Sequence, residues 1–167
     1  LGTSTLFTAN CDGDDATLTS SVAAAIDKNI SVIAATGNVD STTGIASPAC
    51  VTNITAVGGV TKADAMDFNR NNITDLLAPG VSIKSLKPSI GCLGGCSCTE
   101  NFMTCSGTSM STPHVAAAFA LVRQYRKLEN NSVLSPAVIQ DTLNDTGKLI
   151  NDSSGSGLIF RRINILA

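Results

Sequence analysis

The stretch that constrains this chain most runs from Ser106 to Val115 and reads Ser-Gly-Thr-Ser-Met-Ser-Thr-Pro-His-Val. A proline followed by an alanine-rich apolar run predicts the first turn of a helix, because proline has no N–H to bond there and alanine is a strong helix former. Ser109 would then lie at or just inside the positive end of that helix, close to free backbone N–H groups. A hydroxyl that has to become an alkoxide gains from this position, although such a serine commonly serves only as a cap.

Length and charge limit the class of protein. The chain has 167 residues, enough for one domain with a core, and a formal net charge of −2. It therefore has no basic surface for nucleic acid or for an anionic membrane. No run approaches the roughly 18 apolar residues of a membrane span, and the N-terminus lacks the pattern of a signal peptide.

The cysteines favour disulfides and an oxidising compartment, because so many are unusual in a cytosolic enzyme. The four between 92 and 105 are close enough to bind zinc, but their spacing lacks the paired C-x2-C of common zinc modules. All six are Cys11, Cys50, Cys92, Cys96, Cys98 and Cys105. Six Asn-x-Ser/Thr triplets agree with secretion but are a weak indication in a chain so rich in Ser and Thr. They begin at Asn29, Asn53, Asn72, Asn130, Asn144 and Asn151.

Helix and strand signals alternate along the chain. The first helix has its apolar period from Leu18, is capped by Asp14 or Asp15, and ends near Asn29. The helix that carries Ser109 continues to about Lys127, and another begins at Ser135-Pro136 and ends at Gly147. Strands are predicted at 30–35, as a buried strand, at 53–60, ended by Gly58-Gly59, and at 75–78, 81–83 and 158–166.

The segment 87–105 is predicted as a loop, either stapled or functional, because it is long for a structureless connection. No interior linker divides the chain. The alternation of helices and strands predicts the α/β class, with a mainly parallel sheet and helices on both faces.

A serine nucleophile needs a base, a carboxylate that orients the base, and donors for the oxyanion. The single histidine, His114, follows Ser109 by five residues. In a helix it would point about 140° away and lie about 7.5 Å further along the axis, so we expect a packed histidine and not the base. Without a base, no carboxylate completes a triad, and the candidates are loop acids or caps: Asp12, Asp14, Asp15, Asp64, Asp67 and Asp75.

The stretch from Gly107 to Val115 resembles the nucleophile motif of the subtilisin-like serine proteases. Ile33-Ala34-Ala35-Thr36-Gly37-Asn38 resembles the family segment whose asparagine donates to the oxyanion. Further similar segments follow in the family's order: Ser47-Pro48-Ala49, Ile54-Thr55-Ala56-Val57-Gly58, 75–83 and Arg162-Ile163-Asn164.

The resemblance implies a subtilisin-like fold, incomplete at its N-terminus, with residues 1–167 as the C-terminal part of one peptidase domain. In subtilisins the triad order is Asp, His, Ser, so the Asp and His would lie upstream of Leu1. The implied function is a serine endopeptidase that works through an acyl-enzyme, with Ser109 as nucleophile and Asn38 as oxyanion donor. The chain alone would be inactive. Two alternatives remain open: a non-catalytic subtilase-fold binding or regulatory module, and an unrelated cysteine-stapled or zinc-binding protein.

The resemblance also implies how substrate would bind. Leu1 and Gly2 would form one wall of the specificity pocket and its peptide-pairing strand. Ala35, Thr36 and Gly37 would form the other wall, with Ala46 and Ser47 at the base, leaving room for a sizeable apolar side chain.

By the same resemblance, Cys11 and Cys50 form a disulfide and the protein is secreted or extracellular. The partners would be a polypeptide substrate, an inhibitory propeptide and the N-terminal half of the domain. The chemistry requires no cofactor. The family often holds a structural calcium ion, for which no ligand residues are recognisable here.

Overall fold

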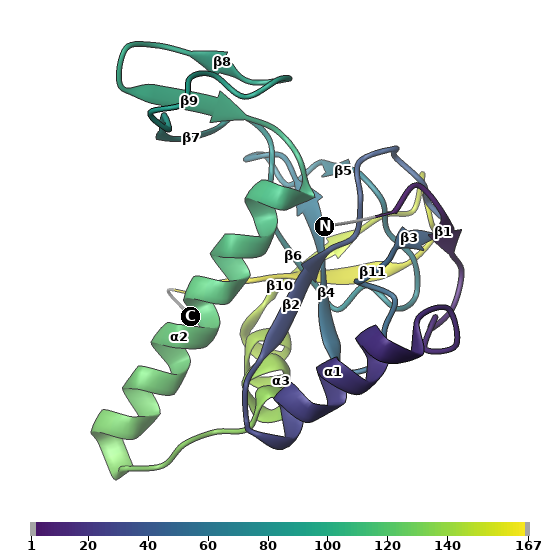
Figure 1. Ribbon diagram of the computed structural model, residues 1–167, viewed down its shortest axis with the longest axis vertical. Coiled ribbons are helices and arrows are strands. Elements are labelled where there is room, and N and C mark those ends of the chain that lie inside the picture. The colour runs from purple at the N-terminus through teal and green to yellow at the C-terminus, as the bar shows by residue number, and fades with distance from the viewer. Residues whose placement is uncertain (1–2, 166–167) are drawn as a thin grey trace.

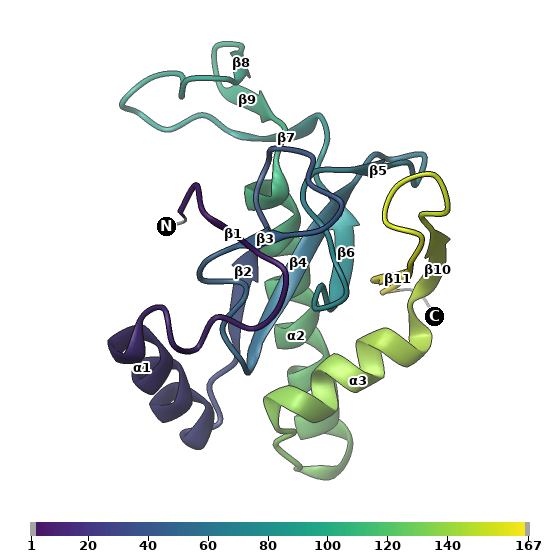
Figure 2. The ribbon, with the colours of Figure 1, turned by 90° about the vertical axis from the view of Figure 1, so that its right-hand side faces the viewer.

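The strands of the main sheet follow the β-branched runs of the sequence. The computed structural model describes residues 3–165, and the strand order is β10-β11-β6-β4-β2, with β5 paired to β4 (Figures 1 and 2). β2, β4, β6 and β11 are parallel, whereas β10 and β5 are antiparallel to their neighbours. The bounds are β2 Val32–Ala35, β4 Ile54–Val60, β5 Met66–Asp67, β6 Leu76–Pro79, β10 Lys148–Asn151 and β11 Ile159–Arg162.

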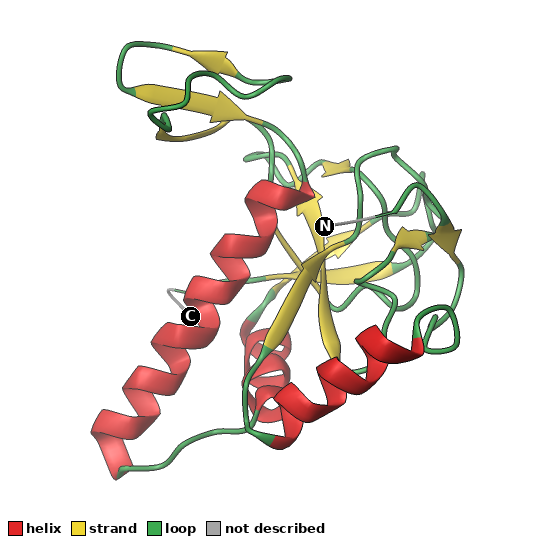
Figure 3. Ribbon diagram, in the orientation of Figure 1, coloured by secondary structure: helices red, strands yellow, loops and turns green. Residues whose placement is uncertain are grey.

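Helices cover both faces of this sheet, as predicted (Figure 3). Ile54 and Ala56 of β4 point to the face covered by α1 (Ala16–Asp27), where Val22 packs among them. Val57 points the other way, into the core formed with α2 (Thr108–Asn130) and α3 (Pro136–Thr146). Alternate side chains of a central strand thus fill two separate cores, which is why the run from 54 to 60 is buried throughout and, apart from Thr55, apolar.

The predicted helix ends are largely confirmed. Asp15 caps α1 by accepting the backbone N–H of Leu18 at 2.9 Å. α1 ends at Asp27, two residues before the predicted end. Ser135 caps α3, Pro136 is its first residue and Gly147 follows its last turn. Each cap satisfies backbone groups that a helix leaves unbonded.

Three strand and helix predictions were wrong in detail. The strand at 30–35 is buried only in part, because β2 is the outermost strand of the sheet order: Ala34 is buried, the rest of β2 is half-buried, and Ile30 is 54 % exposed. Gly58 and Gly59 do not end β4 but lie within it, since the side chains of Leu77 and Phe68 occupy the space that a Cβ would need. Pro113 is the sixth residue of α2, not part of its first turn.

Residues 83–105 form an arm and not an irregular loop. It consists of β7 (Ile83–Leu86), β8 (Ser97–Cys98) and β9 (Phe102–Cys105) in an antiparallel sheet, whereas 81–83 was predicted as the strand. The disulfides Cys92–Cys98 and Cys96–Cys105 staple this arm, which projects from the start of α2 (Figure 1). These disulfides confirm the expectation that so long a connection is stapled. The arm has too few residues to form a core of its own, and the cross-links stabilise it instead.

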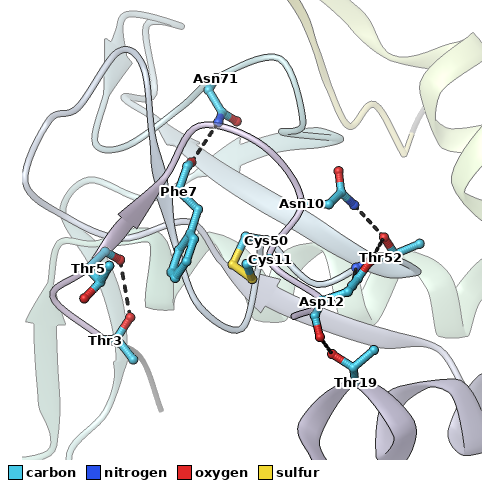
Figure 4. The surroundings of a disulfide bond; sticks show 10 residues. All are labelled: Thr3, Thr5, Phe7, Asn10, Cys11, Asp12, Thr19, Cys50, Thr52 and Asn71. Atoms are coloured by element: carbon cyan, nitrogen blue, oxygen red, sulfur yellow. Dashed lines mark hydrogen bonds between the residues drawn. A yellow bond between two sulfur atoms is a disulfide. The ribbon is translucent and has the colours of Figure 1, made fainter. Parts of the chain in front are cut away.

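A third disulfide, Cys11–Cys50, confirms the predicted pair and is buried (Figure 4). Beside it, β1 (Leu6–Phe7) pairs with β3 (Ile45–Ala46), and Asp12 accepts hydrogen bonds from the N–H and hydroxyl of Thr52 at 2.8 and 2.6 Å. All six cysteines are therefore in disulfides, so the zinc interpretation is wrong. Among residues 3–165, no helix is long and apolar enough to cross a membrane.

Candidate active site

Ser109 is the second residue of α2, and it is exposed. The N-cap residue of α2 is Gly107, which has no side chain with which to cap the helix, and no acidic residue lies in the first turn. The positive end of the helix dipole therefore faces a negative charge that develops beside Ser109, whereas the backbone N–H groups of Thr108 and Met110 are already bonded, to Asn38 Oδ1 and to the carbonyl of Gly107.

Asn38 lies against the same helix end, held by Thr108. Its Oδ1 accepts hydrogen bonds from the backbone N–H of Thr108 at 2.8 Å and from the Thr108 hydroxyl at 2.9 Å. A backbone N–H can only donate, so the oxygen of the amide must face Thr108. The NH2 group of Asn38 is thereby left as a donor. It lies beside Gly107, since a Cβ added to Gly107 would be 3.2 Å from Asn38 Nδ2.

The start of α2 is fixed to the carboxyl ends of β2 and β6. The N–H of Gly107 donates to the carbonyl of Gly80 at 2.8 Å, and the buried Ser111 hydroxyl donates to Ala78 O at 3.0 Å. A Cβ on Gly80 would meet the Ser111 hydroxyl and the Gly107 carbonyl, so this close approach requires glycine. Ser109 therefore stands on a rigid support.

The role of Asn69, which is fully buried, was not predicted from the sequence. Its Oδ1 accepts from the backbone N–H groups of Val39 and Ser41 at 2.9 and 3.1 Å, and its Nδ2 donates to Thr36 O at 3.1 Å. These bonds shape the loop that carries Asn38. A buried asparagine between two strands would have been the only signal, and it is indistinguishable from a turn residue without the structure.

Arg70, next to Asn69, anchors that loop to the C-terminal part of the chain. Its Nε donates to Asp152 Oδ2 at 2.7 Å, and both side chains are more than nine-tenths buried. Burial acts to raise the pKa of Asp152, but the hydrogen bonds from Arg70 and Ser156 hold it below its ordinary value. Asp152 therefore stays ionised, and the pair is a fixed structural tie.

The residues expected to line a specificity pocket come together only in part within the described range. The backbone N–H of Ala46 donates to Thr36 O at 2.9 Å, which brings the segments 35–37 and 46–47 side by side. Thr36 is fully buried, and its hydroxyl donates to Asn69 O at 2.6 Å. Leu1 and Gly2, which were expected to form the other wall, lie outside the described residues.

His114 and Ser109 line the same hollow of about 410 Å³ between the arm and α2. The Nδ1 of His114 is 2.7 Å from the carbonyl oxygen of Met110, one turn earlier, so the ring lies along its own helix and is half-buried. The remaining lining residues are apolar or neutral apart from one lysine: Ile83, Lys84, Ser85, Met103, Cys105, Met110, Pro113 and Ala117. Within residues 3–165, the lining of this hollow thus brings no carboxylate to orient a base.

The only acid of the candidate set with a strongly raised pKa is far from Ser109. Burial raises the pKa of Asp75 to about 6, against hydrogen bonds from Ala56 N–H and Gln140 that favour the charged form. These bonds measure 2.7 and 2.9 Å and join β4, β6 and α3 at the amino end of the strands. Asp75 is therefore a structural and not a catalytic acid.

The family model of the subtilases matches residues 1–159, which is most of the chain. The chain belongs to the subtilase family. Among the relatives of this subtilase, subtilisin BL of Lederbergia lenta is 33% identical over 154 residues, which cover 86% of this chain and 49% of the relative. An intracellular serine protease of Paenibacillus polymyxa is 34% identical over 145 residues, covering 81% and 41%.

Solved structures show the same similarity for this subtilase. A cold adapted subtilisin-like serine proteinase matches all of the chain and 53% of its own, with a TM-score of 0.74 and 31% identity. The prenylagaramide maturation protease PagA matches 97% of this chain over 57% of its own, with a TM-score of 0.77 and 26% identity. The subtilisin-like fold is thereby confirmed, and the chain spans about half or less of the length of the curated relatives it matches.

Proposed function

We propose that this chain is the nucleophile-bearing, C-terminal part of one peptidase domain, in a serine endopeptidase that hydrolyses peptide bonds through an acyl-enzyme. The observation that carries the proposal is the pairing of an exposed Ser109 at a helix start with an amide, Asn38, whose oxygen is held by Thr108. Peptidase chemistry needs these two groups together: a hydroxyl that attacks, and a donor for the oxyanion it creates.

In this mechanism the Ser109 Oγ attacks the scissile carbonyl carbon while a histidine takes its proton. The tetrahedral oxyanion accepts hydrogen bonds from Asn38 Nδ2 and from the Ser109 backbone N–H. Collapse breaks the C–N bond, the histidine returns its proton to the leaving amine, and water then hydrolyses the ester. The helix dipole of α2 lowers the energy of the oxyanion further.

The histidine and the aspartate would come from the N-terminal half of the domain, upstream of Leu1. Two surfaces of this chain suit that half. β2 is the last strand of the sheet order among the described residues, so one of its edges is open to a further parallel strand. The hollow beside Ser109 lies between the arm and α2 and is lined mainly by apolar side chains. Residues 1–167 alone are expected to be inactive.

The substrate would be a polypeptide, with one side chain between the segments Ala35–Gly37 and Ala46–Ser47. An inhibitory propeptide is the second expected partner. Three disulfides support a secreted or extracellular protein, because such bonds persist in oxidising compartments. A non-catalytic subtilase-fold module is the alternative, and the intact Ser109 and Asn38 arrangement favours the enzyme over it.

The test is peptide hydrolysis by the natural protein that contains these residues. Ser109→Ala should lower kcat by about 10⁶-fold, the loss known for the nucleophile of a subtilisin. Asn38→Ala should lower kcat by roughly 10²–10³-fold, again a value measured in a subtilisin, with little change in KM. Wild-type hydrolysis by either variant, or equal hydrolysis by residues 1–167 alone, would contradict the assignment.

A further inference from the structure

The structure separates the Asn-x-Ser/Thr triplets by the exposure of their asparagines. A glycan on a folded protein needs a side-chain nitrogen that reaches solvent. Two of the six asparagines are less accessible than the rest, since Asn29 and Asn144 are half-buried and the amide oxygen of Asn29 is itself buried. The other four are exposed: Asn53, Asn72, Asn130 and Asn151.

Three of the exposed asparagines lie at one end of the molecule, away from the nucleophile. Asn53 directly precedes β4 and Asn72 lies just before β6, so both are at the amino end of the parallel strands. Asn130 is the last residue of α2, which begins at the opposite end (Figures 1 and 2). From Ser109 to Asn130 the helix rises about 30 Å.

A side chain near the C-terminus of α2 holds that end of the helix at the amino ends of the strands. The guanidinium of Arg123 donates to the Ser31 hydroxyl, directly before β2, at 3.4 Å, and to Leu134 O at 3.3 Å. The final turns of α2 therefore lie at the amino ends of the strands. Asn130 ends the helix in an Asx turn, in which its Oδ1 accepts the N–H of Ser132 at 3.2 Å, so its Nδ2 remains a free donor for modification.

Asn53 and Asn72 line one hollow of about 390 Å³, whose other walls mix apolar side chains with polar ones such as Thr52, Gln140 and Asp141. The carboxylate of Asp141 disfavours a protein interface, whose buried centre is depleted of charge, and the polar side chains can bond a hydrated sugar. Within residues 3–165, neither asparagine side chain makes a hydrogen bond that a glycan would break.

The turn that carries Asn53 is also rigid. The Cys11–Cys50 disulfide lies next to it, and Asp12 and Asn10 both bond the hydroxyl of Thr52 (Figure 4). A glycan at this position would therefore project from a fixed backbone and would not follow a mobile loop.

We propose that Asn53, Asn72 and Asn130 carry N-linked glycans, which make this end of the molecule a glycosylated face opposite Ser109. The donor would be an oligosaccharide on a polyprenyl diphosphate. A bond forms between the asparagine Nδ2 and the anomeric carbon, the bond from that carbon to the diphosphate breaks, and the amide proton leaves. Because the three sites are remote from Ser109, substrate access is unaffected.

The test is enzymatic removal of N-glycans from the protein of its native source, in heavy-oxygen water, followed by peptide mass spectrometry. Each glycosylated asparagine becomes an aspartate with a heavy-oxygen label. The label is expected at Asn53, Asn72 and Asn130 and not at Asn29 or Asn144. No label at any of the three, or equal labelling of Asn29 and Asn144, overturns the proposal.

Variants secreted from eukaryotic cells give a second readout that does not depend on the protease activity. Asn53→Asp, Asn72→Asp and Asn130→Asp should each remove one glycan step in gel mobility. Asn101→Asp, an exposed asparagine of the arm outside any triplet, makes the same charge change and should leave mobility unaltered. Unaltered mobility in all three variants contradicts the proposal.

Discussion

Replacing Thr108 by valine removes one hydroxyl and keeps the shape of the side chain. That hydroxyl is fully buried, donates to Asn38 Oδ1 at 2.9 Å and accepts the N–H of Gly37 at 3.2 Å. In Thr108→Val, Asn38 keeps only the bond from the Thr108 backbone N–H, and Gly37 N–H loses its acceptor. An unpaired buried donor costs about 1–3 kcal/mol, so the free energy of unfolding should fall by that amount.

The expected fall in kcat follows from the transition-state stabilisation that one oxyanion donor contributes. A whole oxyanion donor contributes roughly 3–4 kcal/mol, as measured in a subtilisin. If half of this depends on one of the two bonds that hold Asn38, Thr108→Val should lower kcat by about 10- to 30-fold and leave KM within about twofold. The assay is steady-state peptide hydrolysis by the natural protein, at a temperature where both forms are folded.

Thr112→Val is the matched control, because the Thr112 hydroxyl donates only to the carbonyl of Thr108 within α2, at 2.8 Å. It should leave kcat almost unchanged. The reasoning is refuted if Thr108→Val hydrolyses peptides at the wild-type kcat while Asn38→Ala does not. A loss of equal size in the Thr112 variant would show that helix stability, and not the position of Asn38, sets the rate.

Three further predictions concern stability. The pKa of Asp75 is about 6 in the folded state against an ordinary 3.8, so the folded state binds the proton more tightly than the unfolded state. The free energy of unfolding should therefore fall by up to about 3 kcal/mol as pH rises between these values. Asp75→Asn should flatten that part of the pH profile measured by denaturant unfolding. Arg70→Met leaves the buried Asp152 without its partner and should cost about 3–5 kcal/mol in urea unfolding, whereas a loss below 1 kcal/mol would mean that the pair is unimportant. Replacing Cys11 and Cys50 by alanine opens a link across 39 residues and should cost about 4 kcal/mol, with an unchanged midpoint as the contrary result.

The sequence predicted most of the elements because their signals are local. Caps such as Asp15 and Ser135 are read from a few neighbouring residues, and the run of β4 is apolar apart from Thr55. The edge position of β2 was not predictable, since burial depends on which strand lies beside it. Gly58 and Gly59 were misinterpreted for the same reason: the space that a Cβ would need is taken at Gly58 by the side chain of Leu77 and at Gly59 by the ring of Phe68, both distant along the chain.

The candidate site was likewise predictable only where its signals are local. Ser109 and Asn38 follow from a motif and a resemblance, but nothing local to either shows that Thr108 holds the amide by its oxygen, because the two residues are 70 positions apart. The tie between Arg70 and Asp152 spans 82 positions. Such contacts depend on the folded topology, and only the structure brings them together.

The most direct test of the account is labelling with a fluorophosphonate, followed by peptide mapping. In the natural protein that contains these residues, Ser109 should be the labelled residue, and the label should be absent from the Ser109→Ala variant and from residues 1–167 produced alone. Strong labelling of Ser109 in the isolated residues 1–167 would contradict the claim that the base comes from outside them. An unlabelled Ser109 in the folded natural protein would contradict its role as nucleophile.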